Sequence, residues 1–128
     1  MAAVPGPDPE PTAPLLDRSV LDDLRGLPGG AGGSALTEIL ALYRETAPSL
    51  LRGLRDAVGA GDLRAAERVA HTLRGSTLNL GGAALGVFAG RIEAAARGGD
   101  AEAARALMPE IEDLYRRTLD ALGTEAGS

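Results

Sequence analysis

Apolar side chains recur three to four residues apart along most of the chain from about residue 15 onward, which is the spacing of one face of an α-helix. A short stretch around Val20, Leu21 and Leu24 comes first, and four longer amphipathic stretches follow it. Glycine-rich segments separate them, namely GLPGGAGG, GAGD, GG and RGGD. Because short loops between amphipathic helices favour antiparallel neighbours, the pattern predicts an all-α protein, an antiparallel up-down four-helix bundle with a short extra N-terminal helix.

Side chains suited to helix capping mark the starts of three of the long helices. Ser34 precedes the first, Asp62 the second and Asp100 the fourth. Pro48 and Pro109 fall inside the first and fourth helices, where a proline removes one backbone hydrogen bond. We therefore expect a kink or a split at Pro48 and a kink at Pro109.

Composition divides the chain into one domain and two tails. Residues 1–14 are proline-rich and acidic, and such a segment buries too little apolar area to order itself. We expect a disordered N-terminal tail at 1–14, the bundle at 15–123 and a disordered C-terminal tail at 124–128. The chain is 45% hydrophobic but only 2% aromatic, so leucine, alanine, valine and isoleucine must fill the core.

Charge and cysteine content exclude several classes of function. The net charge is −5 and all 13 basic residues are arginines, which argues against general binding of nucleic acid. Without cysteine the chain forms no disulfide and no zinc–thiolate site. No apolar run is long enough to span a bilayer and the N-terminus lacks the features of a signal peptide, so we expect a cytoplasmic protein.

The chain has one histidine, His71, inside the predicted second helix. A helical wheel of about 100° per residue places Leu73 and Leu80 opposite His71, so the ring points away from the core. Arg74 and Gly75 share its exposed side. Because glycine inside a helix costs roughly 1 kcal/mol relative to alanine, we interpret Gly75 as clear space beside the ring and Arg74 as a cation for an anionic group attached to it.

This arrangement suits a phosphoryl acceptor. Near pH 7 a neutral imidazole offers a lone pair on one nitrogen, and its other nitrogen then needs a hydrogen-bond acceptor. Glu93, in the third long helix beside the small residues Gly86, Ala89 and Gly90, could orient the ring. A solvent-facing Glu93 without any such role explains its spacing about equally well. An unremarkable surface histidine is the alternative for His71, and the glycine at position 75 argues against it.

The segment AHTLRGSTLNLGGAALGVFAGRIEAAARGGD resembles the histidine-containing phosphotransfer (HPt) domain. That family's pattern is roughly H-x-L-K-G-[SA]-[SA], with a glycine ten residues and a leucine fourteen residues after the histidine, and an Ile/Leu-Glu/Gln pair near positions 21 and 22. Arg74 replaces the commoner lysine, and Thr77 replaces a smaller residue. The matching residues are His71, Leu73, Arg74, Gly75, Ser76, Thr77, Gly81, Leu85, Ile92 and Glu93.

The resemblance implies that His71 is phosphorylated on its exposed ring nitrogen and exchanges the group with an aspartate on the receiver domain of a response regulator or hybrid histidine kinase. His71, Arg74, Gly75 and Glu93 would then form the site. The chain has no glycine-rich nucleotide loop and no carboxylate cluster for a metal, so it would be a phosphoryl carrier without ATP chemistry of its own. The receiver domain would bring the Mg²⁺. We expect the carrier to be a monomer.

Two groups of residues are candidates for binding the partner. Arg64 and Arg68 share the face of His71 and would attract an acidic receiver site. The candidates for an apolar docking patch are Leu78 and the short N-terminal element with Val20, Leu21 and Leu24.

The sequence offers three alternatives to a free-standing phosphotransfer protein. A non-phosphorylated helical adaptor could bind a signalling partner through the same face, although the His71, Arg74 and Gly75 trio argues against it. A metal or haem protein fails for lack of ligands, with one histidine and no cysteine. The chain also resembles the phosphoacceptor module of chemotaxis-type kinases, in which a glutamate at the position of Glu93 also occurs.

Overall fold

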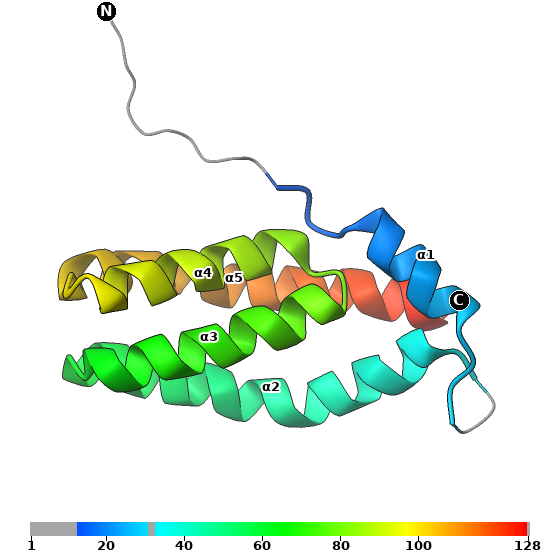
Figure 1. The fold of residues 1–128 in the computed structure, drawn as a ribbon, viewed down its shortest axis with the longest axis horizontal. Helices are drawn as coiled ribbons and strands as arrows, with labels where there is room; N and C mark the ends of the chain where they lie inside the picture. The colour runs from blue at the N-terminus through cyan, green and yellow to red at the C-terminus, as the bar shows by residue number, and fades with distance from the viewer. Residues whose placement is uncertain (1–12, 31–32, 128) are drawn as a thin grey trace, which may run out of the picture.

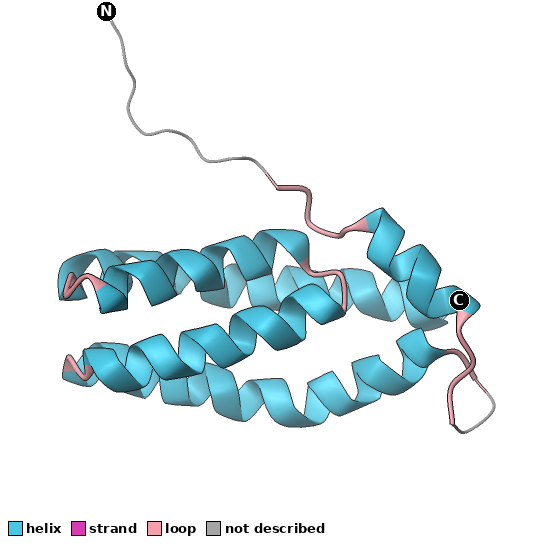
Figure 2. Ribbon diagram, viewed as in Figure 1, coloured by secondary structure: helices cyan, strands magenta, loops and turns pink. Residues whose placement is uncertain are grey.

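The computed structural model describes residues 13–30 and 33–127, and within these ranges it contains helices and loops but no β-strand (Figure 2). The elements are α1 (Arg18–Gly26), α2 (Ala35–Ala60), α3 (Leu63–Asn79), α4 (Ala83–Arg97) and α5 (Ala101–Gly127). The long helices run up and down side by side, and α1 lies across one end of the bundle (Figure 1). The predicted four-helix bundle with a short extra N-terminal helix is confirmed.

The four long helices form a closed ring of neighbours, α2 on α3, α3 on α4, α4 on α5 and α5 on α2, while α1 packs against α2. None of the helices in the described ranges is long and apolar enough to cross a membrane.

The expected caps are present at the starts of α2, α3 and α5. Ser34, Asp62 and Asp100 each accept a hydrogen bond from the backbone N–H three residues further on. These bonds use N–H groups that a helix start leaves without an intrahelical partner. Glycines with a left-handed backbone follow α2, α3 and α4, namely Gly61, Gly81 and Gly99.

Of the kink or split expected at Pro48, the split does not occur, because α2 continues without interruption through Pro48. In the same way α5 is one helix through Pro109. Each proline is exposed but follows a buried residue, Ala47 in α2 and Met108 in α5, so core contacts hold the helix on both sides of the lost hydrogen bond. The helix α2 bows along its length in Figure 1 but does not break.

The core consists of two apolar clusters. The larger one fills the middle of the bundle and includes Leu54, Leu73 and Ile92, each without solvent exposure. The second lies under α1 and joins Leu21 to Tyr43 and other residues of the long helices. Within the described residues this core contains almost exclusively aliphatic side chains, as the composition predicts.

The C-terminal tail expected at 124–128 is wrong for residues 124–127, which continue α5 to Gly127. Glu125 pairs with both Arg18 and Arg25 of α1, and Ala126 packs against the cluster beneath α1. These contacts stabilise the last turn, which no local signal in the sequence indicates. The bundle therefore extends from about residue 15 to 127, whereas Ser128 and residues 1–12 of the expected N-terminal tail lie outside the described residues.

Candidate functional site

Small residues on α4 allow it to approach α3 closely. A Cβ atom added at Gly86 would overlap the side chain of Leu78, and one added at Gly90 would lie 3.1 Å from Cδ of Arg74. The absence of these side chains gives room for α3 residues to lie directly on α4. This close approach positions Glu93, one turn after Gly90, against the histidine of α3.

His71 and Glu93 form the centre of the site. The His71 side chain is 65% exposed and the Glu93 side chain only 7% exposed, and Nδ1 of the ring lies 2.9 Å from Oε2 of the carboxylate. The ring is therefore accessible to a partner but held at one edge by a buried acceptor. The contact between Glu93 and the His71 ring, which the sequence offered as one of two alternatives, is present in the structure.

Two arginines neutralise Glu93. Arg74 Nε lies 3.0 Å from Oε1, and Arg97 Nη2 donates to Oε2 at 2.9 Å. Burial acts to raise the pKa of Glu93, but the hydrogen bond from His71 and the charges of Arg74 and Arg97 outweigh it and lower the pKa below its ordinary value. Glu93 is thus an ionised carboxylate at neutral pH.

The ionised state of Glu93 determines the tautomer of the histidine. A carboxylate only accepts hydrogen bonds, so a bond between it and Nδ1 requires a proton on Nδ1. In the neutral ring the lone pair then lies on Nε2. The site therefore presents Nε2 as the nucleophilic atom and holds Nδ1 as the protonated one.

The side chain of Arg74 contacts Glu93, whereas the sequence suggested that it would face an anionic group attached to the His71 ring. Its side chain crosses over Gly90 to reach Glu93, and its Nη2 is 3.5 Å from Nδ1 of His71. The guanidinium is thus on the Nδ1 side of the ring, next to the carboxylate, rather than at the nitrogen with the lone pair. In this structure Arg74 holds Glu93 and adds positive charge behind the ring.

An open pocket of about 600 Å³ adjoins His71 and is lined by residues of α3 and α4. The helical wheel places Arg64 and Arg68 on the face of His71, and the structure brings both to the pocket, while Arg74 and Gly75 do not line it. The wheel does not indicate Thr72 or Arg97, which also line the pocket. A usable signal for Arg97 exists, since it follows Glu93 by four residues on one helix face. The lining residues are Arg64, Glu67, Arg68, His71, Thr72, Glu93 and Arg97.

Gly75 and Leu78 lie further along the exposed side of α3. A Cβ at Gly75 would meet no atom within 4 Å, so the glycine has no packing requirement inside this chain. Leu78 is 41% exposed, and the end of its side chain lies over Gly86. Both are accessible to a partner that approaches His71.

The docking patch expected around Val20, Leu21 and Leu24 is wrong in its central residue. Leu21 is fully buried in the cluster that joins α1 to the bundle, and Leu24 packs against the same cluster. The apolar face of α1 therefore holds α1 in place, because an isolated nine-residue helix needs such burial to be stable. Val20 is half-buried.

No cluster of three or more histidine, cysteine, aspartate or glutamate side chains that could hold a metal ion occurs within 13–30 and 33–127. The two carboxylates that line the pocket beside His71 are instead engaged by arginines: Glu93 by Arg74 and Arg97, and Glu67 by Arg97 at 3.0 Å.

Comparison with known proteins agrees with this geometry. The family model for the Hpt domain matches residues 38–122. The solved structure of histidine-containing phosphotransfer protein B (HptB) from Pseudomonas aeruginosa PAO1 is similar, with a TM-score of 0.79 and 27% identity over 91% of this chain and 97% of that one.

The structure of the histidine-containing phosphotransfer protein MtHPt2 from Medicago truncatula shares the fold, with a TM-score of 0.72 and 16% identity over 87% of this chain and 78% of that one. A search of curated proteins found no match. The chain belongs to the Hpt domain family, whose members carry phosphoryl groups on histidine in two-component signalling.

Proposed function

We propose that His71 accepts a phosphoryl group on Nε2 from an aspartyl phosphate of a response-regulator or hybrid-kinase receiver domain, and returns it to such an aspartate. The observation that carries this proposal is the exposed imidazole whose Nδ1 is held 2.9 Å from the buried, ionised Glu93. Two members of the same structural class, HptB and MtHPt2, are named as histidine-containing phosphotransfer proteins.

The transfer balances without a further reagent. The Nε2 lone pair forms the N–P bond as the bond between phosphorus and the aspartate oxygen breaks, and that electron pair leaves on the aspartate carboxylate. The proton stays on Nδ1, so the ring becomes cationic. Glu93 faces that cation at 2.9 Å, and stabilises positive charge that is absent before the reaction.

The chain's own contribution is a positioned nucleophile and local charge. Glu93 and Arg74 hold the ring's orientation, and Gly75 leaves open the surface beside the ring. Mg²⁺ for the transfer would come with the receiver domain. The chain acts as a carrier and supplies no ATP chemistry in this scheme.

The test uses purified receiver domains that carry labelled aspartyl phosphate. Mixing them with this chain is expected to move the label onto the chain as acid-labile, base-stable phosphate, the stability expected of phosphohistidine. The His71→Gln variant is the control, because a 65% exposed side chain contributes little to stability and the variant should keep its helicity and melting temperature. Labelling of that variant, or no labelling of the parent chain by any receiver domain, would show that the proposal is wrong and favour an adaptor.

A further inference from the structure

The pocket beside His71 is lined by more positively charged than negatively charged side chains. Three arginines line it, together with two glutamates. Both glutamates are bound by the same arginine, Arg97, and Glu93 is also paired with Arg74. The side chains of Arg64 and Arg68 form no ion pair within the described residues, so their charges in this pocket are uncompensated.

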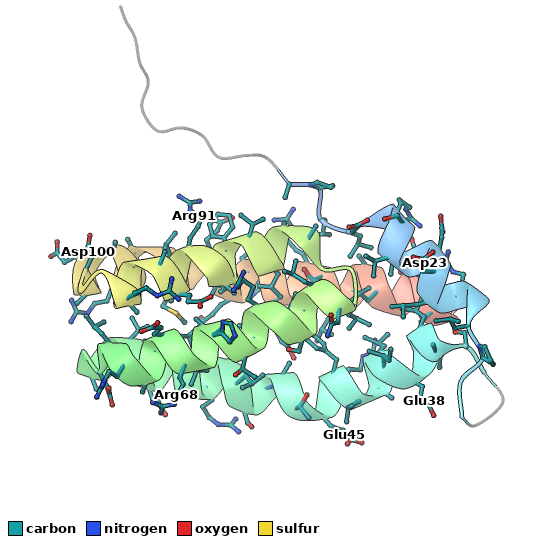
Figure 3. All side chains as sticks on the ribbon, in the orientation of Figure 1. Asp23, Glu38, Glu45, Arg68, Arg91 and Asp100 are labelled. Atoms are coloured by element: carbon teal, nitrogen blue, oxygen red, sulfur yellow. The ribbon has the colours of Figure 1, made fainter. Side chains whose placement is uncertain are left out.

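The position of this charge follows from helix geometry. Arg68 and Arg64 precede His71 by three and seven residues, about one and two turns, on the same face of α3. Figure 3 shows Arg68 on α3 and Arg91 on the outer edge of α4, away from α3. A helical side chain leans over the turn that precedes it, so the His71 ring leans toward the turn that carries Arg68.

Other donors near the ring are already in use. Arg74 and Arg97 are bound to Glu93 on the Nδ1 side of His71. The hydroxyl of Thr72 donates to the backbone carbonyl of Arg68 at 3.2 Å. The guanidinium groups in the pocket that no carboxylate engages are therefore those of Arg64 and Arg68, and their planar shape suits the oxygens of a tetrahedral oxyanion.

We propose that Arg64 and Arg68 bind the oxygens of the phosphoryl group that His71 carries, a role that the sequence suggested for Arg74. The inference rests on the phosphotransfer function proposed above and adds an oxyanion site in the pocket next to His71. The two arginines neutralise the dianionic group in the isolated phosphoprotein, whereas Arg74 acts through Glu93 as a positioning residue.

Because the chain has one histidine, binding can be followed at the site itself. The unphosphorylated protein with ¹⁵N-labelled histidine is titrated with inorganic phosphate at constant ionic strength, with chloride as the reference anion. We expect the His71 ring signals to shift saturably with phosphate. Arg68→Ala, and more so the Arg64→Ala/Arg68→Ala pair, should raise the dissociation constant for phosphate about tenfold or more, the effect of losing a charge-assisted contact.

The matched control is Arg105→Ala, which removes an exposed arginine of α5 outside this pocket and so changes the net charge by the same amount. Arg68→Lys, which keeps the charge but loses the two-pronged geometry, should lie between the parent and Arg68→Ala. Unchanged phosphate affinity in the Arg64/Arg68 pair, or an equal loss in Arg105→Ala, would overturn the inference.

A second measurement examines the phosphoprotein. After labelling by a receiver domain and removal of that domain, the ³¹P signal and the lifetime of the phosphohistidine are compared among the same variants. We expect the Arg64/Arg68 pair to change both, with a lifetime altered severalfold, and Arg105→Ala to change neither. If the pair instead alters only the receiver concentration needed for labelling, the two arginines form a docking surface and the inference is wrong.

The two proposals fail in different ways. A chain that binds phosphate in the pocket but never receives label from any receiver domain retains the oxyanion site and loses the phosphotransfer function. A chain that is labelled normally, with no dependence of phosphate binding or phosphohistidine lifetime on Arg64 and Arg68, retains the phosphotransfer function and loses the site.

Discussion

Oε2 of Glu93, on α4, lies 2.9 Å from Nδ1 of His71, on α3, although the two residues are 22 positions apart in the chain. The carboxylate is 7% exposed and the imidazole 65% exposed, so the contact joins the interior of the bundle to its surface. The two arginines that flank Glu93 keep it ionised and leave Nε2 of the ring as the reactive nitrogen.

Replacing Glu93 by glutamine tests the tautomer directly. The amide keeps the size but loses the charge, so the proton on Nδ1 loses its strong acceptor, and the fraction of the ring with the lone pair on Nε2 should fall. We expect the ¹⁵N signals of His71 to report this shift and the rate of phosphoryl transfer to drop. Glu45→Gln, an exposed glutamate on α2 (Figure 3), is the control. Unchanged ring signals in Glu93→Gln would contradict an orienting role.

The same variant gives a pH-dependent prediction. The pKa of Glu93 is lowered in the folded protein, so its ionisation stabilises the fold above the ordinary carboxylate pKa of about 4.3 and this contribution is lost as the pH falls through the lower folded pKa. Between pH 5 and 3, urea unfolding should therefore show a steeper loss of stability for the parent than for Glu93→Gln. Parallel curves would mean that Arg74 and Arg97 do not hold the carboxylate in its charged form.

Gly75→Ala separates stability from function. A Cβ there meets no atom of this chain within 4 Å, so the variant should be more stable by up to about 1 kcal/mol through helix propensity. It should nevertheless transfer phosphate more slowly, because the methyl group occupies the surface beside the ring that a partner must approach. Gly53→Ala in α2, where the added Cβ only touches Val69 at 4.0 Å, should gain stability without any loss of transfer. Equal transfer rates in the two variants would refute the clear-space interpretation.

The burial of Tyr43 predicts how the free energy of unfolding changes at alkaline pH. Its hydroxyl is buried and hydrogen-bonded to Thr77 at 2.8 Å, and burial raises the pKa of Tyr43 to about 12 despite that bond. An unfolded tyrosine titrates near 10, so the unfolded chain loses its proton first and stability should fall as the pH rises from about 10 to 12. Because the chain has two tyrosines and no tryptophan, the absorbance of Tyr115→Phe follows Tyr43 alone. Ionisation near pH 10 with full helicity would contradict the burial.

Leu21 and Leu78 should respond in opposite ways to truncation. Leu21→Ala removes a fully buried side chain beneath α1 and should cost about 2–5 kcal/mol in the free energy of unfolding, without weakening receiver binding while the protein is folded. Leu78→Ala removes a 41% exposed side chain and should cost less stability but weaken receiver binding. Leu42→Ala, 59% exposed on α2, is the surface control. A loss of receiver affinity in folded Leu21→Ala would restore α1 as a docking element.

Short-range features of the sequence are enough to predict the helices of this protein and the loops between them. Helical periodicity, the caps at Ser34, Asp62 and Asp100, and the glycine-rich loops are properties of a few consecutive residues, so they predict the bundle and its connections. The same periodicity puts His71 on the exposed face of α3, since the face from which a side chain leaves a helix follows from its position in that helix.

Contacts between helices account for what the pattern did not predict. Glu125 is ordered because two arginines of α1 reach it across the fold, and Leu21 is buried because α1 has the bundle beneath it. The direction of Arg74 depends on the room that Gly90 leaves, a property of how closely α3 and α4 approach. A long arginine side chain can reach several partners from one backbone position, so only the packing of the neighbouring helix selects among them.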